Sequence, residues 1–342
     1  MTMGVVRSEP RRLLTTPVRV RCPVLTMRVQ FTSLVDNQEG GGACFLLQLG
    51  EALLLLDCGW DDAFDPRQLG ELAALAPMID AVLVTHADVA HLGALAYAVE
   101  QLGLVAPVYA TLPVVKMGLL HMYDALATAL QRWTGFDCFT LDSIDRSIGG
   151  AHEIKYAQIV KLSGRARGIT IAPHPAGHSI GGCVWRISIG AEEILYCPEY
   201  NHLRERHLPP GRLDRFSKPS LLIAGTRHAL ASAERSAPRT FIKLVSSALL
   251  RGGDVLVPSD AAGRCLELLS LLEAQWRGQP LLHAYPIVFL AHQAFNTIEF
   301  AKSQLEWLSD AGAQTPLTTH PTARSLSSHA LDHTICHSCE GV

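Results

Sequence analysis

The sequence predicts an α/β protein built as an α+β sandwich of strands and helices around large apolar surfaces. Short apolar strands joined by turns open the ordered part of the chain, strands then alternate with helices, and hairpins return later. The chain has 342 residues, of which 48% are hydrophobic, so it can bury a substantial core in one large or two ordinary domains.

The first predicted strands are connected by short turns. Residues 29–34, 44–49 and 52–56 are apolar runs of strand length, and the last run ends at Asp57-Cys58-Gly59. Short connections of this kind favour antiparallel pairing. Residues 65–75 follow helical spacing, so we expect a short helix before the next strand.

Strands alternate with helices from residue 81 onward. Residues 81–84 and 108–110 are short apolar strands, whereas residues 91–102 carry apolar side chains at helical spacing. A long helix is predicted over residues 113–130, because Pro113 stands in its first turn, where a missing amide hydrogen does no harm.

The next segment returns to antiparallel sheet. A strand is predicted within residues 154–162, another at 169–171, and a hairpin over 183–197 that turns at Gly190-Ala191. After Pro219 the pattern becomes α/β again, which indicates a second module from about residue 221. Its predicted elements are strands at 221–224 and 255–257 and helices at 239–250 and 263–277.

Charge and cysteine content narrow the class of protein. The 29 basic and 32 acidic residues give a net charge of -3, so no overall cationic field attracts nucleic acid, although a local patch stays open. Nine cysteines scattered among apolar residues suit reduced thiols better than a disulfide framework. No apolar run approaches the roughly 18 to 20 residues that cross a bilayer, so no membrane segment is expected.

The two ends of the chain differ from the rest. Residues 1–28 hold six arginines and one glutamate, which indicates a disordered extension, although a transit peptide shares this composition. Residues 314–342 are rich in Ser, Thr and His without periodicity and are expected to be disordered too. Zinc binding at Cys336 and Cys339 is disfavoured, because no second ligand pair follows.

Several histidines and carboxylates stand where predicted strands end. Imidazoles and carboxylates that converge on one pocket are the ligands with which two-metal hydrolases activate water. Each residue also has a plainer interpretation, since an aspartate before a glycine forms turns and a lone histidine or glutamate commonly lies in a solvated loop. The candidates are Asp57, His86, Asp88, His91, His178 and Glu199, whereas His174, His202, His207 and His228 are expected to be surface or loop histidines.

Longer strings of residues extend this picture. The chain resembles the metallo-β-lactamase and β-CASP nucleic-acid-processing family, and within that family its non-catalytic members. The resemblance implies an αββα metallo-β-lactamase fold over residues 29–220, followed by a partial β-CASP α/β domain over residues 221–313. It rests on residues 55–61, 79–83, 91–99, 109–118, 122–124, 175–182, 204–208, 262–268 and 303–307.

The resemblance assigns metal-site positions, and this chain departs from them. Beside Asp57, the positions of the first metal match His86, Asp88 and His178, those of the second match Ala90 and His91, and Glu199 matches the bridging residue. Ala90 has no ligand atom, which leaves the second metal two donors where at least three are usual. Residues 221–226 also lack the acidic residue of active relatives. We therefore expect no catalytic residue and no metal, with one zinc at His86, Asp88, His178 and Glu199 as the alternative.

The resemblance implies a function as well. We expect a nuclear, non-catalytic scaffold that associates with pre-mRNA in the machinery that cleaves its 3′ ends before polyadenylation. Its partners would be a catalytic β-CASP paralogue and other subunits of the cleavage and polyadenylation machinery. The alternatives are a mononuclear zinc-dependent RNA endonuclease or other hydrolase, and a degraded gene fragment. Because the family's domains continue beyond this length, we also expect a truncated chain whose tail after Ala313 reflects a frameshift or read-through.

Overall fold

The computed structural model describes residues 29–35, 41–205, 207–225, 237–308 and 323–325. The predictions for residues 1–28 lie outside this range. The same holds for the predicted disorder of residues 314–342, except that Ala323–Ser325 forms strand β13, which pairs in parallel with β12 (Ile287–Phe289). In the part of the chain that is described, no helix is long and apolar enough to cross a membrane.

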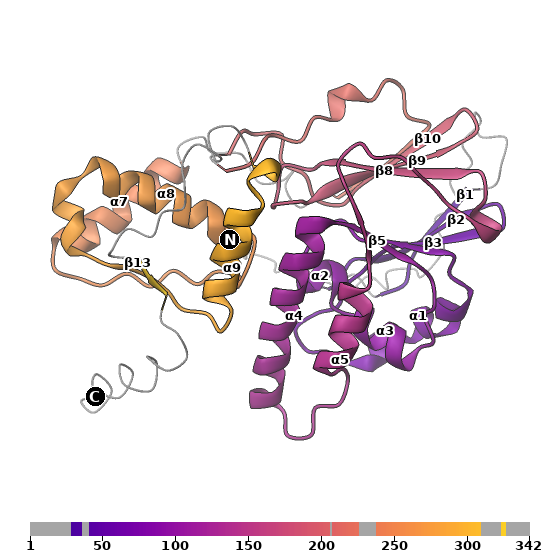
Figure 1. Ribbon diagram of the computed structural model, residues 1–342, viewed down its shortest axis with the longest axis horizontal. Helices are drawn as coiled ribbons and strands as arrows, with labels where there is room; N and C mark the ends of the chain where they lie inside the picture. The colour runs from indigo at the N-terminus through magenta and orange to yellow at the C-terminus, as the bar shows by residue number, and fades with distance from the viewer. Residues whose placement is uncertain (1–28, 36–40, 206, 226–236, 309–322, 326–342) are drawn as a thin grey trace, which may run out of the picture.

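A six-stranded sheet forms the first layer of the body (Figure 1). Its first three strands pair antiparallel and the others pair in parallel, as the switch from hairpins to alternating helices predicted. The strands are β1 (Val29–Ser33), β2 (Cys44–Leu49), β3 (Ala52–Cys58), β4 (Ala81–Leu83), β5 (Val108–Thr111) and β6 (His152–Ile154).

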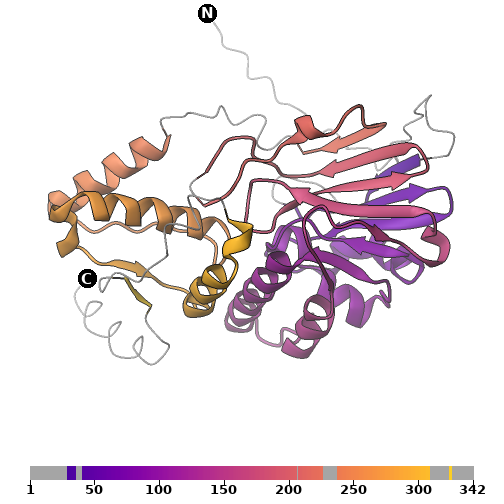
Figure 2. The same ribbon diagram turned by 45° about the horizontal axis from the view of Figure 1, so that its top comes forward.

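Helices cover one face of this sheet, and a second sheet covers the other (Figures 1 and 2). Side chains along β3 therefore alternate between two cores: Leu55 packs toward the helices, whereas Leu54 and Leu56 pack between the sheets. The covering helices are η1 (Pro66–Leu69), α1 (Gly70–Leu75), η2 (Ala76–Met78), α2 (Val89–Leu92), α3 (Leu95–Gln101), α4 (Leu112–Arg132), α5 (Leu141–Ile144) and the turn η3 (Asp145–Gly149).

The second sheet has five strands in the order β11-β10-β9-β8-β7. Trp185 and Ile187 of β9 face the core between the sheets, whereas Val184 faces outward, where it joins a small cluster with Leu213. The elements are β7 (Val160–Lys161), η4 (Gly164–Ala166), β8 (Ile169–Pro175), β9 (Cys183–Ile189), β10 (Glu192–Cys197), η5 (Leu213–Arg215) and β11 (Leu221–Ala224).

Four predicted elements differ in the structure. The strand predicted within residues 154–162 is confined to Val160–Lys161 of β7, whereas Ile154 belongs to β6 of the other sheet. The helix predicted over 91–102 is interrupted at Gly93-Ala94. Residues 255–257 form no strand, because no described strand pairs with them. Residues 221–224, expected to open the second module, instead pair in parallel with β10 and complete the second sheet of the body.

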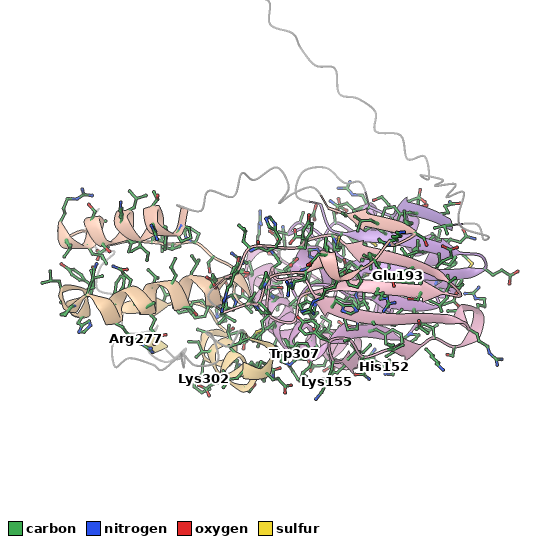
Figure 3. The ribbon with its side chains drawn as sticks, turned by 90° about the horizontal axis from the view of Figure 1, so that it is seen from above. His152, Lys155, Glu193, Arg277, Lys302 and Trp307 are labelled. Atoms are coloured by element: carbon green, nitrogen blue, oxygen red, sulfur yellow. The ribbon has the colours of Figure 1, made fainter. Side chains whose placement is uncertain are left out.

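The C-terminal region lies beside the body and contains α7 (Ala237–Leu250), α8 (Arg264–Gly278), η6 (Pro280–Ala284), α9 (Ala294–Ser303) and η7 (Leu305–Trp307). Figure 3 shows Trp307 where this region meets the body. The Trp307 ring packs against Tyr156 with ring centroids 4.5 Å apart. At the start of α8, the Ala262 amide donates to Nε2 of His121 on α4 at 3.3 Å.

Candidate functional site

The candidate residues meet at one edge of the two sheets. Asp57 is the penultimate residue of β3, His86 and Asp88 lie in the turn after β4, and His91 lies in α2. The β8–β9 turn carries His178, and Glu199 follows β10. The His86 ring lies 4.8 Å from the ring of His91 and 5.5 Å from that of His178, measured between centroids. The structure therefore brings together the group that the sequence singled out, although its metal-site role stays a prediction.

A buried hydrogen-bond chain fixes His86. Asp57 is fully buried and adopts a left-handed φ of 57°, which is unusual for a residue with a side chain. Its carboxylate accepts hydrogen bonds from the Thr85 amide at 2.7 Å, the Thr85 hydroxyl at 2.8 Å and the Tyr196 hydroxyl at 2.7 Å. Burial raises the pKa of Asp57 to about 6, although the charge of His91 and these hydrogen bonds oppose the rise.

These hydrogen bonds set the tautomer of His86. The Thr85 hydroxyl gives its single hydrogen to Asp57, so it accepts from Nδ1–H of His86, 2.9 Å away. The lone pair of His86 then lies on Nε2, which is buried and has no hydrogen-bond partner. Burial, together with electrostatic repulsion from the neighbouring imidazoles, lowers the pKa of His86 to about 3. His86 is therefore a neutral imidazole with the tautomer of a metal ligand.

His91 is engaged differently. Its Nδ1 lies 2.7 Å from Oδ1 of Asp88, and the His91 side chain is 4% exposed. Burial disfavours the imidazolium, but the charge and hydrogen bond of Asp88 outweigh it and raise the pKa of His91 to about 9. Burial likewise opposes ionisation of Asp88, yet His91 holds the pKa of that carboxyl below its ordinary value. The two side chains form an ion pair at neutral pH.

The β8–β9 turn is packed against His86. The Cys183 amide donates to the Thr85 carbonyl at 3.0 Å, and a Cβ at Gly182 would lie 2.9 Å from Cδ2 of His86. In the same turn, Nε2 of His178 lies 3.0 Å from Oε2 of Glu199. Only glycine at 182 lets the turn approach this closely.

Ala90 makes close backbone contacts with neighbouring segments, but its methyl side chain offers no ligand atom to a metal. Its carbonyl accepts from the Ala43 amide at 2.6 Å, and a Cβ at Gly59 would lie 1.6 Å from the same oxygen. At the neighbouring strand end, β11 pairs Ala224 with Cys197 of β10, so Gly225 lies beside Pro198 and neither Ala224 nor Gly225 offers a donor side chain there. The donor set does not fit a two-metal centre.

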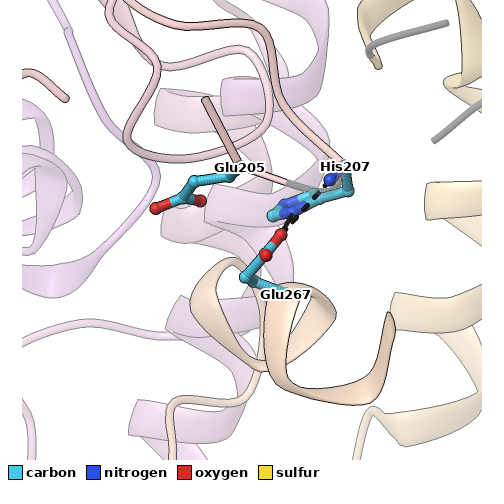
Figure 4. A group of neighbouring side chains, drawn as sticks. All are labelled: Glu205, His207 and Glu267. Atoms are coloured by element: carbon cyan, nitrogen blue, oxygen red, sulfur yellow. Dashed lines mark hydrogen bonds and ion pairs between the residues drawn. The ribbon is translucent and has the colours of Figure 1, made fainter. Parts of the chain in front are cut away.

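Within the described residues, one group of three side chains brings possible ligand atoms within 4.8 Å of one another: Glu205, His207 and Glu267 (Figure 4). These residues connect two regions. Nδ1 of His207, from the loop after β10, contacts the Glu267 carboxylate of α8. Glu205 accepts from Arg264 of α8 at 2.7 Å and from the side-chain amide of Asn201 at 2.7 Å. Because a guanidinium already neutralises Glu205, this cluster is better explained as a contact between the body and the C-terminal region than as a cation site. We call this contact the joint.

The histidines outside the site were expected at the surface or in loops. His207 lies in a loop but is 4% exposed, because α8 covers it. His174 is half-buried and His202 is exposed, whereas His228 lies outside the described residues. Sequence reasoning also missed Thr85 and Tyr196. The position of Thr85 directly before His86 could have suggested its role, but Tyr196 has no local signal, since it reaches Asp57 across 139 residues.

A pocket of about 190 Å³ opens between this site and the start of α8. Carboxylates from both sides face it, which makes it a poor place for an anion. Its polar lining residues are Asp88, His121, His178, Ser179, Glu199, Asp260 and Arg264. The amides of Arg264 and Cys265 donate to Asp260, so the α8 N-terminus is already capped.

Comparison with known proteins agrees with this geometry. Residues 46–224 match the metallo-beta-lactamase superfamily domain, and the chain belongs to this superfamily. The match ends with β11, in agreement with the place of that strand in the body.

Several relatives carry a more particular name, cleavage and polyadenylation specificity factor subunit 2. The chain is 44% identical to the rice protein (Oryza sativa subsp. japonica) over 285 residues and 44% identical to that of Arabidopsis thaliana over 286 residues, each alignment covering 83% of this chain. It is 43% identical over 291 residues, 84% of this chain, to the Drosophila melanogaster protein, whose name carries the word "probable". The chain spans 38% of the length of each relative.

Proposed function

We propose that this chain acts as a non-catalytic subunit in pre-mRNA 3′-end cleavage and polyadenylation, where it pairs with a catalytic β-CASP paralogue. The identity of 43–44% to proteins named as a subunit of a cleavage and polyadenylation factor supports this role. The proposal places the chain in the nucleus, in contact with pre-mRNA and other subunits of that machinery. It remains the favoured hypothesis over a zinc-dependent nuclease.

The donor set of the candidate site carries the proposal. Two-metal hydrolysis needs a pair of ions that hold the attacking and the leaving oxygen. Ala90 offers a methyl group where the second ion would need an oxygen, and the imidazole of His91 is bound by Asp88 at 2.7 Å. The Asp88 carboxylate, which stands at a first-metal position, is thereby already engaged with His91 and is less available to an ion.

The surrounding scaffold supports a structural role. The hydrogen bonds that link Tyr196, Asp57 and Thr85 still orient His86 as they would orient a metal ligand, although the ligand set is incomplete. These buried polar groups tie β3, β4 and β10 together, so they stabilise the edge of the body even without chemistry there.

Metal analysis of the purified chain tests the loss of activity. We expect zinc well below one equivalent after exposure to zinc and dialysis, and no RNA cleavage that a chelator abolishes. The variants His86→Ala and His178→Ala should then leave metal content unchanged. Stoichiometric zinc that disappears in both variants, together with chelator-sensitive cleavage, would contradict the proposal and favour the mononuclear enzyme.

Co-expression tests the partnership. The chain and the catalytic paralogue from the same organism should elute together in size-exclusion chromatography, and cleavage by the pair should survive His86→Ala in this chain. Separate elution of two folded proteins would refute the pairing.

A further inference from the structure

A pocket larger than the one at the candidate site lies in the C-terminal region, where it also reaches α4 of the body. Its volume is about 650 Å³, and we call it the apolar pocket. Val245, Leu249 and Trp276, which belong to the buried cluster of this region, form part of its lining. Most of the other lining side chains are apolar too, and they come from α8 and from residues 255–258 and 286–291. A pocket of this size and lining favours an occupant with apolar groups.

Residues 255–258 border the apolar pocket in neither a helix nor a strand. Within the described part of the chain, their main-chain amides and carbonyls make no hydrogen bond. The other extended segment at the pocket, β12, is already paired with β13. Free main-chain groups beside an apolar surface are the feature by which one polypeptide accepts a strand from another.

Several apolar side chains at this edge are exposed. Leu256 is 87% exposed and Leu290 is 60% exposed, and both line the pocket. Val255, Val257 and Val288 are exposed as well, although to a smaller extent. A strand laid along residues 255–258 would cover these side chains while it pairs with the main chain beside them.

The polar lining of the pocket is acidic. Asp124 of α4 is half-buried, and its carboxylate has no hydrogen bond or ion pair with any described residue. The second carboxylate, that of Asp260, accepts from the amides of Arg264 and Cys265. The described lining residues include no lysine or arginine. The pocket therefore attracts a cation and repels a phosphate.

We propose that the apolar pocket binds a strand of another protein, whose apolar side chains enter the pocket and whose lysine or arginine pairs with Asp124. Main-chain pairing with residues 255–258 supplies affinity, and the side chains supply the choice of sequence. An RNA strand would place phosphates beside two carboxylates, and a small apolar amine would leave the main chain of residues 255–258 unpaired. The inference goes beyond the proposed function, because it concerns the C-terminal region and not the candidate site.

Peptide binding by the full chain tests the pocket. The probe is a labelled peptide of alternating valine and threonine with a lysine at each end, and fluorescence anisotropy at low salt should show saturable binding. Methylation of the central amide nitrogens of the peptide should abolish binding, because a methylated amide cannot donate to residues 255–258. Replacement of both lysines by glutamate should weaken binding at least about tenfold, because like charges then meet at Asp124.

A variant of the protein tests the charge contact separately. Asp124→Asn keeps the shape of the side chain and should weaken binding of the lysine peptide about fivefold, as expected for loss of a partly exposed ion pair. It should also remove most of the difference between the lysine and the glutamate peptide. The matched control is Asp137→Asn, which changes an exposed acid outside the described lining and should bind as the unaltered chain does.

Four results would overturn the proposal. They are no binding of the lysine peptide, equal binding of its methylated form, equal binding of the glutamate form, and tighter binding of a single-stranded RNA that Asp124→Asn strengthens. Light scattering adds a further check on the occupant. A dimer of the unaltered chain that Leu256→Asp converts to a monomer would show that a second copy fills the pocket, and the proposal would then be wrong. None of these results bears on pairing with the catalytic paralogue, so the proposed function is tested independently.

Discussion

The body, residues 29–225, and the C-terminal region, residues 237–308, bury apolar surface in different ways. In the body, the six-stranded sheet lies between the helices and the second sheet, and side chains such as Leu54, Leu55 and Trp185 are fully buried. The C-terminal region has a buried cluster of its own that comprises Val245, Leu249, Trp276 and Leu282.

Large apolar side chains that are more than 60% exposed are more frequent in the C-terminal region, although the longer body has Val105 and Ile159. Leu244, Leu256, Leu281 and Phe295 of the C-terminal region are each more than 60% exposed. A sheet between two layers buries side chains on both of its faces. The helices of the C-terminal region bury only the faces that they turn toward one another, so their other faces stay exposed. We therefore expect the body to dominate the free energy of unfolding, while the joint at α8 anchors the C-terminal region.

The largest expected effect compares two leucines. Leu55→Ala removes a fully buried side chain of the body and should reduce the free energy of unfolding by about 2–5 kcal/mol. Leu256→Ala changes a side chain that is 87% exposed and should alter it by less than about 0.5 kcal/mol. Urea unfolding followed by circular dichroism measures both. Equal losses would break the comparison between the regions.

A smaller effect concerns pH and the body alone. The folded-state pKa of His91 is raised to about 9, so its contribution to stability is complete below pH 6.5 and is lost as pH rises through about 9. Asp88→Asn removes the partner and should flatten this pH dependence. We expect a change of only about 1 kcal/mol, because the Asp88 side chain is 37% exposed and solvent screens the pair.

The control for this pH effect is Asp65→Asn. Asp65 is paired with Arg67 at the surface, and hydrogen bonds from Arg67 lower the pKa of its carboxyl, so it does not titrate above pH 6.5. Between pH 6 and 9, the free energy of unfolding measured in urea should therefore change with pH in this variant as it does in the unaltered chain. An unchanged slope in Asp88→Asn would show that the pair does not stabilise the body.

The smallest expected effect on the body comes from Trp276→Ala. Trp276 is 5% exposed, and its Nε1 donates to the Tyr285 carbonyl at 2.8 Å, within the cluster of the C-terminal region. Its loss should open residues 237–308 locally, with a change below about 0.5 kcal/mol in the unfolding of the body. Hydrogen exchange resolved by segment would detect this. Loss of protection in β3 or β9 would show that the regions unfold as one.

The sequence predicted much of the body because its signals are local. Hydrophobic runs located β2 and β3, and helical spacing together with Pro113 located α4. The strand predicted within residues 154–162 is only the short β7, because Ile154 at the start of that range pairs in the other sheet, which no local pattern records. The strand predicted at 255–257 was wrong for a related reason, since strand propensity alone cannot supply a pairing partner.

The candidate site shows the same limit. The residue types at 86, 88, 90 and 91 were readable from the sequence, and so was the missing ligand atom at Ala90. The ion pair between Asp88 and His91 depends on the helical turn that begins there. The hydroxyl that reaches Asp57 from Tyr196 depends on the packing of two sheets.

The sequence by itself determined the order of strands and helices, the membership in a family and the loss of an oxygen ligand at position 90, because each follows from residue type and spacing. Tertiary structure decided which carboxylate neutralises which histidine, how α8 buries His207, and where residues 255–258 border an apolar pocket. The physical reason is that charge and hydrogen-bond energies depend on distance and burial, and only the folded chain sets those.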